Sequence, residues 1–356
     1  MSNSTIYSDI KFGLHDNAER YIWVAYLLFV LLSSLIGDTL ILAASFQKDA
    51  FKINQLIVTV IQQLAVSDLI NSIFIVLPTA TSLVANSWIL GHTICKFQSY
   101  LIFFVNPVCI WLIAVLTTFK FLILRHPLQA SRLSTKSAHQ VCVFVWVICF
   151  STPILMVVAD KGDVYFDYRT YNCSYDFNDD FWKYLLPPMT LIFSLAPNLV
   201  VFLTTVPTLK YLMAARKSAR RSQGHVPWQG AITVALTAIV YTISTLPGAL
   251  YQFLNKFIPV QEHSSDCFHV KFFRIGAIFM MINTMANFYI YSLTIKSFRR
   301  FLLSKVQLAV SIPLNSSRNT KNPRETGNVH DFYFYLNFVT SYYTCITLWY
   351  PIYDWA

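Results

Sequence analysis

The sequence predicts an all-α membrane protein whose fold is a seven-transmembrane-helix bundle. The first observation is composition: 55% of the 356 residues are hydrophobic and 12% are charged, against about 25% charged residues in a typical soluble domain. The second is a series of seven long apolar stretches, each about as long as the roughly 17–25 residues that a helix needs to cross hydrocarbon. A soluble fold of this composition would expose large apolar patches, so the soluble classes are excluded.

The seven stretches alternate with polar loops along the chain. Asp38, Asp68 and Lys120 are the charged residues within the first three, and the last four carry no charge. Helices are expected because every backbone polar group must be paired within the segment in lipid, and the alternation of a membrane barrel is missing. The stretches cover residues 22–46, 54–84, 98–124, 141–159, 184–209, 226–255 and 275–295.

The distribution of Lys and Arg predicts the orientation. Seven spans put the two termini on opposite sides, and basic loops favour the cytoplasm. One set of loops is rich in Lys and Arg and has Asp49 as its acid, whereas the set with the N-terminus has more acids than bases. The N-terminus is therefore expected outside. The net charge of +10 is spread over separate loops, which argues against a nucleic-acid partner and fits attraction to an anionic lipid bilayer.

The two ends of the chain are expected to lie outside the bundle. Residues 1–21 form a polar extracellular N-terminus without the features of a cleavable signal peptide, and Asn3-Ser4-Thr5 is a usable glycosylation site. Residues 22–296 form the seven-transmembrane domain. Residues 306–356 form a cytoplasmic tail, largely disordered by composition. Its aromatic-rich end lies at the membrane interface or is a non-native extension.

Cysteine positions fit this topology. Cys109, Cys142 and Cys149 fall within spans, where a thiol behaves as a small apolar group. Cys95 begins the third span and Cys173 lies between the fourth and fifth, so both face the oxidising side and could form a disulfide. Asn172-Cys173-Ser174 is also a formal glycosylation site, with which a disulfide would compete.

Polar residues within spans are costly and are functional candidates. Asp68 lies in the middle of the second stretch, and Asn283 and Asn287 lie in the seventh. Pro197 and Pro247 interrupt the fifth and sixth, where a proline frees backbone carbonyls and lets a helix bend.

Together these motifs resemble the rhodopsin-like (class A) family of G-protein-coupled receptors, of which this chain looks like a divergent, orphan member. "LIGDTL" matches the family's Gly-Asn with Asp38 in the Asn place, and "LAVSDL" matches its second-span motif at Asp68. "NFYIY" is similar to Asn-Pro-x-x-Tyr and keeps Asn287 and Tyr291. The resemblance covers about residues 20–305 and includes Trp88, Cys95, Trp146, Cys173, Pro197, Pro247 and "SFRRF".

The departures from the family concern its activation machinery. Phe119-Lys120-Phe121 replaces Asp-Arg-Tyr, and Ser244-Thr245-Leu246-Pro247 lacks the Trp of Cys-Trp-x-Pro. Phe288 replaces the proline of the seventh span, and Thr205 replaces a tyrosine of the fifth. The family fold is therefore expected, while the usual coupling mechanism is not assured.

The resemblance implies several site residues. Cys95 and Cys173 correspond to the family's outer disulfide. Residues 297–305 correspond to its amphipathic juxtamembrane helix, with Phe298, Phe301 and Leu302 on one face. A polar intramembrane site that could hold sodium is implied at Asp68, with Asp38, Cys109, Asn283 and Asn287 nearby. Two close carboxylates do not both ionise easily, so one would share a proton or a cation. The alternative is a neutral, hydrogen-bonded packing network.

The cytoplasmic end is implied to meet a heterotrimeric G protein. Lys120 stands where the family keeps an arginine, and it is either a cation of the coupling end or a lysine that extends to the interface. For the other basic residues, determination of the topology is an equal alternative. The coupling end comprises Lys120, Arg125, Arg216, Lys217, Arg220, Arg221 and Tyr291.

The sequence thus predicts a plasma-membrane, multi-pass receptor that transduces an unknown extracellular signal, with a chemosensory or peptide-like ligand. Six acids in residues 160–180 suggest a cationic ligand or simply a solvated loop, and Ile102 argues against a monoamine. We expect no enzyme, since no nucleophile–base pair, metal cluster or phosphate loop is evident. The alternatives are a seven-span ligand-gated channel of inverted topology, a non-signalling decoy receptor and a small transporter.

Overall fold

The computed structural model describes residues 17–47, 50–51, 53–159, 163–168, 170–176, 180–222, 233, 236–245 and 266–305. The chain divides into two compact units at Ile295 and Lys296. Several sequence predictions lie outside the described residues, namely the glycosylation site at Asn3, the kink at Pro247 and the tail 306–356. The side chains of Arg216, Lys217, Arg220 and Arg221 also lie outside what is described.

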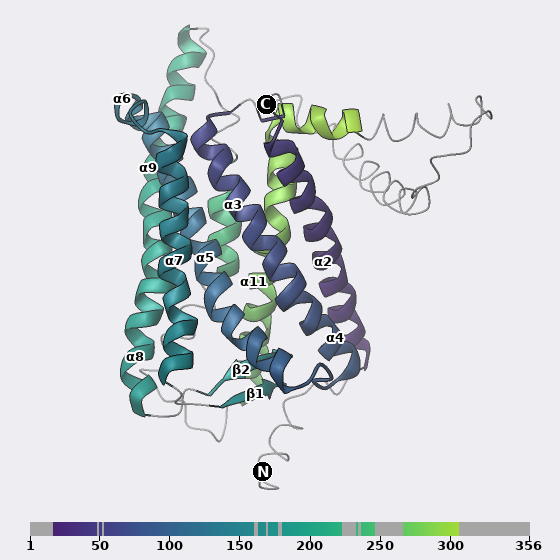
Figure 1. Ribbon diagram of the computed structural model, residues 1–356. Coiled ribbons are helices and arrows are strands. Elements are labelled where there is room, and N and C mark those ends of the chain that lie inside the picture. The colour runs from purple at the N-terminus through teal and green to yellow at the C-terminus, as the bar shows by residue number, and fades with distance from the viewer. Residues whose placement is uncertain are drawn as a thin grey trace, which may run out of the picture. The chain divides into compact units, whose positions relative to one another are not determined.

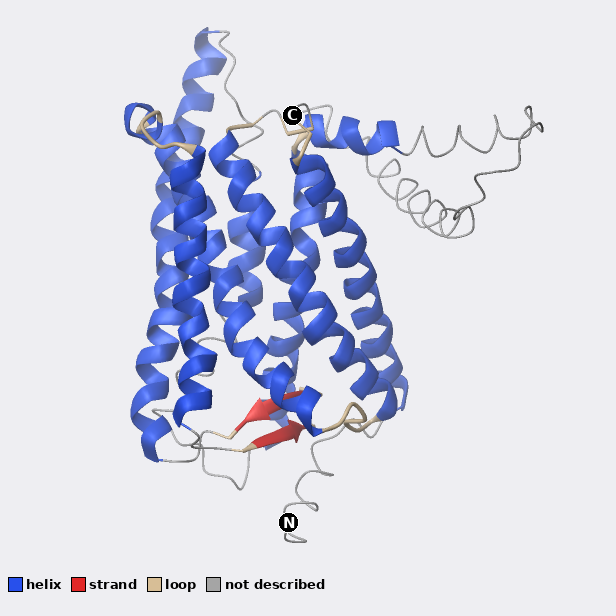
Figure 2. Ribbon diagram, viewed as in Figure 1, coloured by secondary structure: helices blue, strands red, loops and turns tan. Residues whose placement is uncertain are grey.

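The first unit is a bundle of long helices (Figures 1 and 2). Two single π-helical turns join pairs of helices into continuous rods: η1 (Ser72–Val76) joins α3 to α4, and η2 (Leu191–Leu195) joins α8 to α9. A shorter apolar helix covers Leu236–Thr245. The helices are α2 (Asn17–Ser45), α3 (Gln55–Asn71), α4 (Leu77–Ala85), α5 (His92–Arg125), α6 (Pro127–Ala130), α7 (Thr135–Ala159), α8 (Asp180–Thr190), α9 (Ala196–Ser222) and α11 (Asp266–Thr294).

Five of these rods are long and apolar enough to cross a membrane, and they coincide with the first five predicted stretches. The helical class of the prediction is therefore confirmed. The sixth stretch is described only in part, and the seventh lies on α11. The rods cover Ala18–Ser45, Gln55–Ala85, His92–Arg125, Thr135–Ala159 and Asp180–Ala214.

Helix boundaries extend beyond the apolar stretches. The helix α5 begins at His92, six residues before the apolar stretch, after Gly91, whose φ of 83° lies in the left-handed region. The Trp88 indole N–H donates to the Gly91 carbonyl at 2.7 Å and closes the preceding turn. Polar residues thus extend the helical rods past the hydrocarbon-length core, which hydropathy alone cannot show.

Both π-helical turns lie just before a proline. The turn η1 precedes Pro78, and η2 precedes Pro197. A proline lacks an N–H and its ring clashes with the carbonyl four residues earlier, and a widened turn accommodates both effects. The predicted irregularity at Pro197 thus takes the form of a π turn, and an equivalent one at Pro78 was not predicted.

A β-hairpin lies at one end of the bundle, opposite the end that carries α6 (Figure 1). The strands β1 (Val164–Asp167) and β2 (Asn172–Tyr175) are antiparallel, with Val164 opposite Tyr175 and Asp167 opposite Asn172. Tyr171 makes the turn with a φ of 56°. Its hydroxyl donates to Asn86 at 2.9 Å, which fixes the hairpin tip to the end of α4.

Two apolar clusters hold the hairpin on the helices. Tyr171 belongs to one buried cluster with Leu27 and Leu31 of α2, Val76 of η1 and Met281 of α11. At the other side Tyr175 packs with Met156 of α7 and the fully buried Trp182 of α8. The hairpin therefore crosses from the α7–α8 side of the bundle to the α2–α11 side.

The outward face of α7 is apolar and exposed. Phe144, Val147 and Val158 are exposed there, while Cys142 and Cys149 on the inward face are fully buried. Water does not favour such a surface, whereas lipid does. The pattern agrees with the prediction of a bundle in a bilayer.

The second unit begins with a helix over residues 296–305. Phe298, Phe301 and Leu302 are buried, and the Phe298 and Phe301 rings stack with centroids 6.3 Å apart. Lys305 lies over the Phe301 ring at 5.6 Å. The apolar residues that were expected on one face are thus the buried ones.

Candidate functional site: a buried polar core

Two carboxyl groups lie in the interior of the bundle. Asp38 of α2 is fully buried and Asp68 of α3 is 2% exposed. They are close enough to interact electrostatically. Burial of a carboxyl group is costly without hydrogen-bond donors, so the surrounding polar residues decide how the pair is held.

Asp68 of α3 is held by residues from two other helices. Asn287 of α11 donates from Nδ2 to Asp68 Oδ2 at 2.9 Å. The Cys109 thiol of α5 lies 3.7 Å from Asp68 Oδ1 and 3.3 Å from the Ser67 hydroxyl. A second link between α3 and α11 runs from Asn71 to Thr284 at 3.4 Å. The core therefore joins α3, α5 and α11 at one point.

Asp38 is held from α2 and η1. The Ser34 hydroxyl donates to Asp38 Oδ2 at 2.5 Å, and the Ser72 hydroxyl donates to Ser34 at 2.7 Å. Asp38 Oδ1 and the hydroxyl of the buried Tyr291 have no hydrogen-bond partner within the part of the chain that the structure describes. Ser34 and Ser72 are not among the residues predicted from the sequence, although small hydroxyl residues in apolar spans are typical interhelical donors.

Asn283, the other asparagine predicted near Asp68, joins two helices. Its Oδ1 accepts from the Ser244 hydroxyl at 2.9 Å and so joins α11 to the helix Leu236–Thr245. The neighbouring Thr245 donates to Asn198 of α9 at 3.4 Å. Ser244 and Thr245 replace the first two residues of the Cys-Trp-x-Pro motif. Two hydroxyls thus connect this helix to α9 and α11, at the positions of the motif's Cys and Trp.

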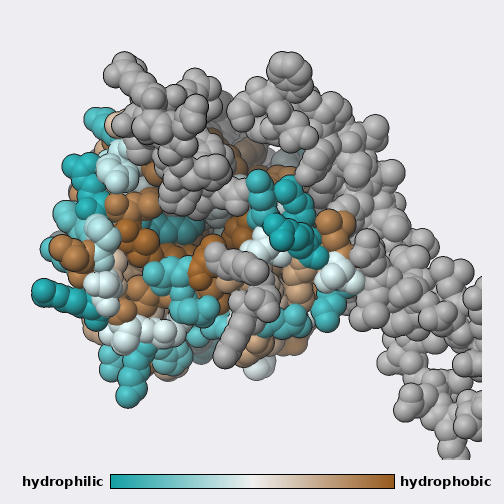
Figure 3. All heavy atoms as spheres, turned by 90° about the horizontal axis from the view of Figure 1, so that it is seen from above, coloured by the Kyte–Doolittle hydropathy of each residue, from teal (hydrophilic) through white to brown (hydrophobic). Residues whose placement is uncertain are grey.

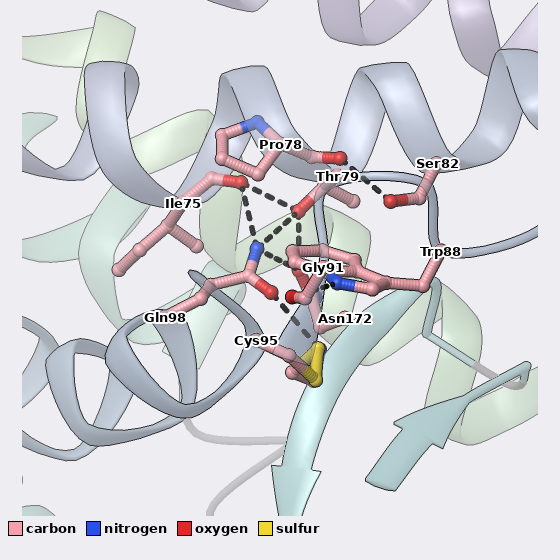
Figure 4. The surroundings of a disulfide bond; sticks show 10 residues. Ile75, Pro78, Thr79, Ser82, Trp88, Gly91, Cys95, Gln98 and Asn172 are labelled. Carbon is pink, nitrogen blue, oxygen red and sulfur yellow. Dashed lines mark hydrogen bonds between the residues drawn. A yellow bond between two sulfur atoms is a disulfide. The ribbon is translucent and has the colours of Figure 1, made fainter. Parts of the chain in front are cut away.

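At the hairpin end, Cys95 of α5 and Cys173 of β2 form a disulfide with Cα atoms 5.3 Å apart (Figure 4). This confirms the predicted pair. The bridge joins the hairpin to the first turn of α5.

Gln98 supports the same junction one turn further along α5 (Figure 4). It is fully buried, and its Oε1 accepts from the Cys173 backbone N–H at 3.0 Å. Its Nε2 donates to Asn172 Oδ1 at 3.2 Å and to the Ile75 carbonyl at 3.3 Å. The Thr79 hydroxyl also contacts Asn172 Oδ1. Gln98 is not among the residues predicted from the sequence, although an uncharged polar residue close to a predicted disulfide is a usable signal.

Comparison with known proteins decides the family. The sequence matches the family described as "7 transmembrane receptor (rhodopsin family)" over residues 37–291, well over half of the chain. The chain belongs to this family. The family implies a seven-helix bundle, in agreement with the helices described above, and its members are receptors rather than enzymes.

The receptor is similar to several named relatives at low identity. It is 24% identical to green-sensitive opsin-4 of Danio rerio over 75% of this chain and 76% of the relative. It is 22% identical to rhodopsin of Petromyzon marinus over 83% of each chain. It is 24% identical to proteinase-activated receptor 1 of Xenopus laevis over 46% of this chain and 40% of that protein.

The end of the bundle opposite the hairpin carries residues that were predicted to contact a G protein. Seen from that end, hydrophilic and hydrophobic residues both reach the surface (Figure 3). Arg125 lies over the Tyr211 ring of α9 at 5.8 Å, and Thr204 donates to Thr117 at 3.0 Å, so α5 and α9 are joined there.

Lys120 does not extend to the surface. It is 8% exposed and its neighbour Phe119 is 7% exposed. No acid pairs with Lys120 among the described residues, and the Thr205 hydroxyl of α9 is also buried without a described partner. Of the predicted site residues, Asp38, Asp68, Cys109 and Asn287 lie together in the polar core. Lys120 lies apart from them, in the last turns of α5.

Proposed function

We propose that this receptor transduces an extracellular chemosensory or peptide-like signal to a heterotrimeric G protein across the plasma membrane. The observation that supports it best is the buried polar core, which joins α3, α5 and α11 through Asp68 and Asn287. Such a core has few alternative arrangements, so a ligand that favours one of them shifts a two-state equilibrium. The ligand is proposed to bind among the third, fifth, sixth and seventh spans.

Charge supports an orientation with the hairpin outside. The hairpin end carries acids such as Asp163, Asp176 and Asp180, whereas the α6 end carries Arg125, Arg132 and Lys136. Basic residues favour the cytoplasmic side. We therefore propose that the ligand enters at the hairpin end and that the G protein binds at the α6 end.

The function is tested by a ligand screen on cells that report G-protein activation, with an N-terminal tag stained on intact cells. Surface staining and a ligand-dependent signal are expected. Intracellular staining of the N-terminus would refute the orientation and favour an inverted channel. Ligand binding without G-protein activation would identify a decoy receptor instead.

We further propose that sodium is held at Asp68. The Asp68 carboxylate and the Ser67 hydroxyl are oxygen ligands of the kind that a hard cation prefers, and both are buried. The Cys109 thiol is a soft ligand and fits sodium poorly, so the oxygen atoms would carry the binding. When bound, the ion would neutralise charge in the core.

Asp68→Asn is expected to abolish any sodium dependence of the receptor. The asparagine keeps the shape of the side chain and removes the charge that attracts the ion. The measurement is the thermal unfolding midpoint of purified receptor in sodium chloride and in the chloride of a large organic cation. Asp176→Asn, at the hairpin end, is the control and should keep the wild-type response. An equal sodium response in Asp68→Asn and wild type would refute the site.

We also propose that Lys120 is a weaker latch than the arginine of the family. Lysine lacks the planar, bidentate guanidinium group, and the buried Phe119 offers no carboxylate to hold it. The inactive state should therefore be less firmly held at this end of α5.

The double variant Phe119→Asp with Lys120→Arg is expected to lower ligand-independent signalling several-fold, because a buried carboxylate–guanidinium pair restores the latch. Basal G-protein activation is measured at equal surface expression. Phe121→Asp with Lys120→Arg is the control, since its acid is placed on the other side of residue 120. Equal basal signalling in wild type and the Phe119 variant would show that the site is not a latch.

A further inference from the structure

A glycine notch on α2 is filled by an aromatic ring of α11. Gly37 is buried, and a Cβ atom added to it would lie 2.5 Å from Cγ and 2.6 Å from Cβ of Phe288. These are the atoms of Phe288 closest to its own backbone, so the ring cannot swing away without movement of the helix. Glycine lets two helices approach this closely because it has no side chain.

Phe288 stands where the family has a proline. No proline occurs anywhere in α11, which runs without interruption from Asp266 to Thr294. Every peptide N–H of the rod is thus retained, and the chain has no proline kink to set the direction of its inner half. Another contact must therefore fix the position of this part of α11.

The residues on either side of Phe288 make specific contacts with α2 and α3. The hydroxyls of Tyr289 and Ser33 lie 2.9 Å apart, and the Tyr289 ring stacks on Phe29 with centroids 6.5 Å apart. On the other side, Asn287 donates to Asp68 at 2.9 Å. Phe288 therefore lies between the residue that binds the polar core and the residue that binds α2.

We propose that Phe288, seated in the Gly37 notch, is the positioning residue that holds Asn287 on Asp68. The notch takes over the task of the missing proline and sets the axial and rotational position of α11 against α2. The regulatory part of this inference rests on the proposed receptor function. The packing part does not, so the two are tested separately.

The packing part is tested by thermal unfolding of the purified full-length receptor. Gly37→Ala is expected to lower the unfolding midpoint, although alanine favours a helix more than glycine does. In a Phe288→Gly background both the Cγ and the Cβ atom of residue 288 are removed, and Gly37→Ala should leave the midpoint unchanged or raise it. Ala43→Val, which adds more volume on the exposed side of the same helix, is the control and should have little effect. A loss of equal size in both backgrounds would overturn the proposal.

The role of Phe288 in positioning Asn287 is tested by combining Gly37→Ala with a change in the polar core. Asn287→Ala should lower the midpoint in the wild-type background and have little further effect once Gly37→Ala has displaced α11. A purely structural notch would give additive losses instead, as independent sites do, and additivity would overturn the positioning role. If Gly37→Ala does not fold, Phe288→Ala, which removes the ring from the notch, replaces it in the same comparison with Asn287→Ala.

The regulatory part is tested by ligand-independent G-protein activation at equal surface expression. Gly37→Ala should change it by about tenfold, as expected when a hydrogen bond to a charged group is lost in one of two states. Phe288→Ala should change it in the same direction, because it removes the residue that holds Asn287 on Asp68. Failure of every variant, including wild type, to signal would refute the receptor function and leave the thermal result to decide the notch. Signalling that is unchanged by Gly37→Ala alone would refute the regulatory role.

Discussion

Replacement of Cys95 and Cys173 by alanine is expected to destabilise the receptor by about 2–5 kcal/mol. The bridge closes a loop of 78 residues, which contains most of α5, all of α7 and the first hairpin strand. In the chain-entropy account a loop of this length is costly to leave open. The inserted helices already restrict the unfolded chain, which places the effect below the upper limit.

The measurement is the thermal unfolding midpoint of purified receptor, together with surface staining of cells. Cys149→Ala is the matched control, because Cys149 is a buried cysteine without a disulfide. Surface staining should fall strongly for the double variant and remain for the control. A double variant that matches Cys149→Ala in both measurements would contradict the prediction.

Gln98→Leu is expected to destabilise the hairpin junction by about 2–4 kcal/mol, because its amide satisfies several buried groups. The Cys173 N–H loses its acceptor, and the Ile75 carbonyl and Asn172 Oδ1 each lose a donor. A buried polar group left without a partner costs about 1–3 kcal/mol. Leucine has nearly the same volume, so the loss comes from hydrogen bonds rather than from a cavity.

The effect should be local as well as global. Backbone amides of residues 164–175 should exchange hydrogen faster in Gln98→Leu while the disulfide remains intact. Gln62→Leu is the control, since Gln62 is half-buried and donates a single described hydrogen bond, to Ser45. If the two leucine variants had equal stability and equal exchange, the junction would depend on the disulfide alone.

The sequence predicted the helices because the physical signal is strong. A rod in lipid must be apolar over its full length, and α7 or α5 shows this without reference to any other part of the chain. Boundaries were less predictable, since the polar ends of α5 and α2 are helical through backbone hydrogen bonding rather than hydropathy.

The candidate site was predicted in part for a related reason. Asp68 and Asn287 stand out because polar groups in spans are rare. The rotation of each helix decides which of them meet, and a sequence does not contain that rotation. The contacts of Asn283 with Ser244, of Gln98 with the hairpin and of Phe288 with Gly37 therefore appear only when the helices are packed.

The buried position of Asn172 has a consequence for biosynthesis. The tripeptide Asn172-Cys173-Ser174 meets the formal requirement for N-linked glycosylation, a modification that is bulky and belongs on a surface. In the folded receptor the Asn172 amide is enclosed by Gln98 and Thr79, beside the disulfide. A sugar attached there would keep β2 from reaching α5. In the proposed orientation, with the hairpin outside, we therefore expect this loop to close before the asparagine is modified, and a molecule that is glycosylated first is expected not to mature.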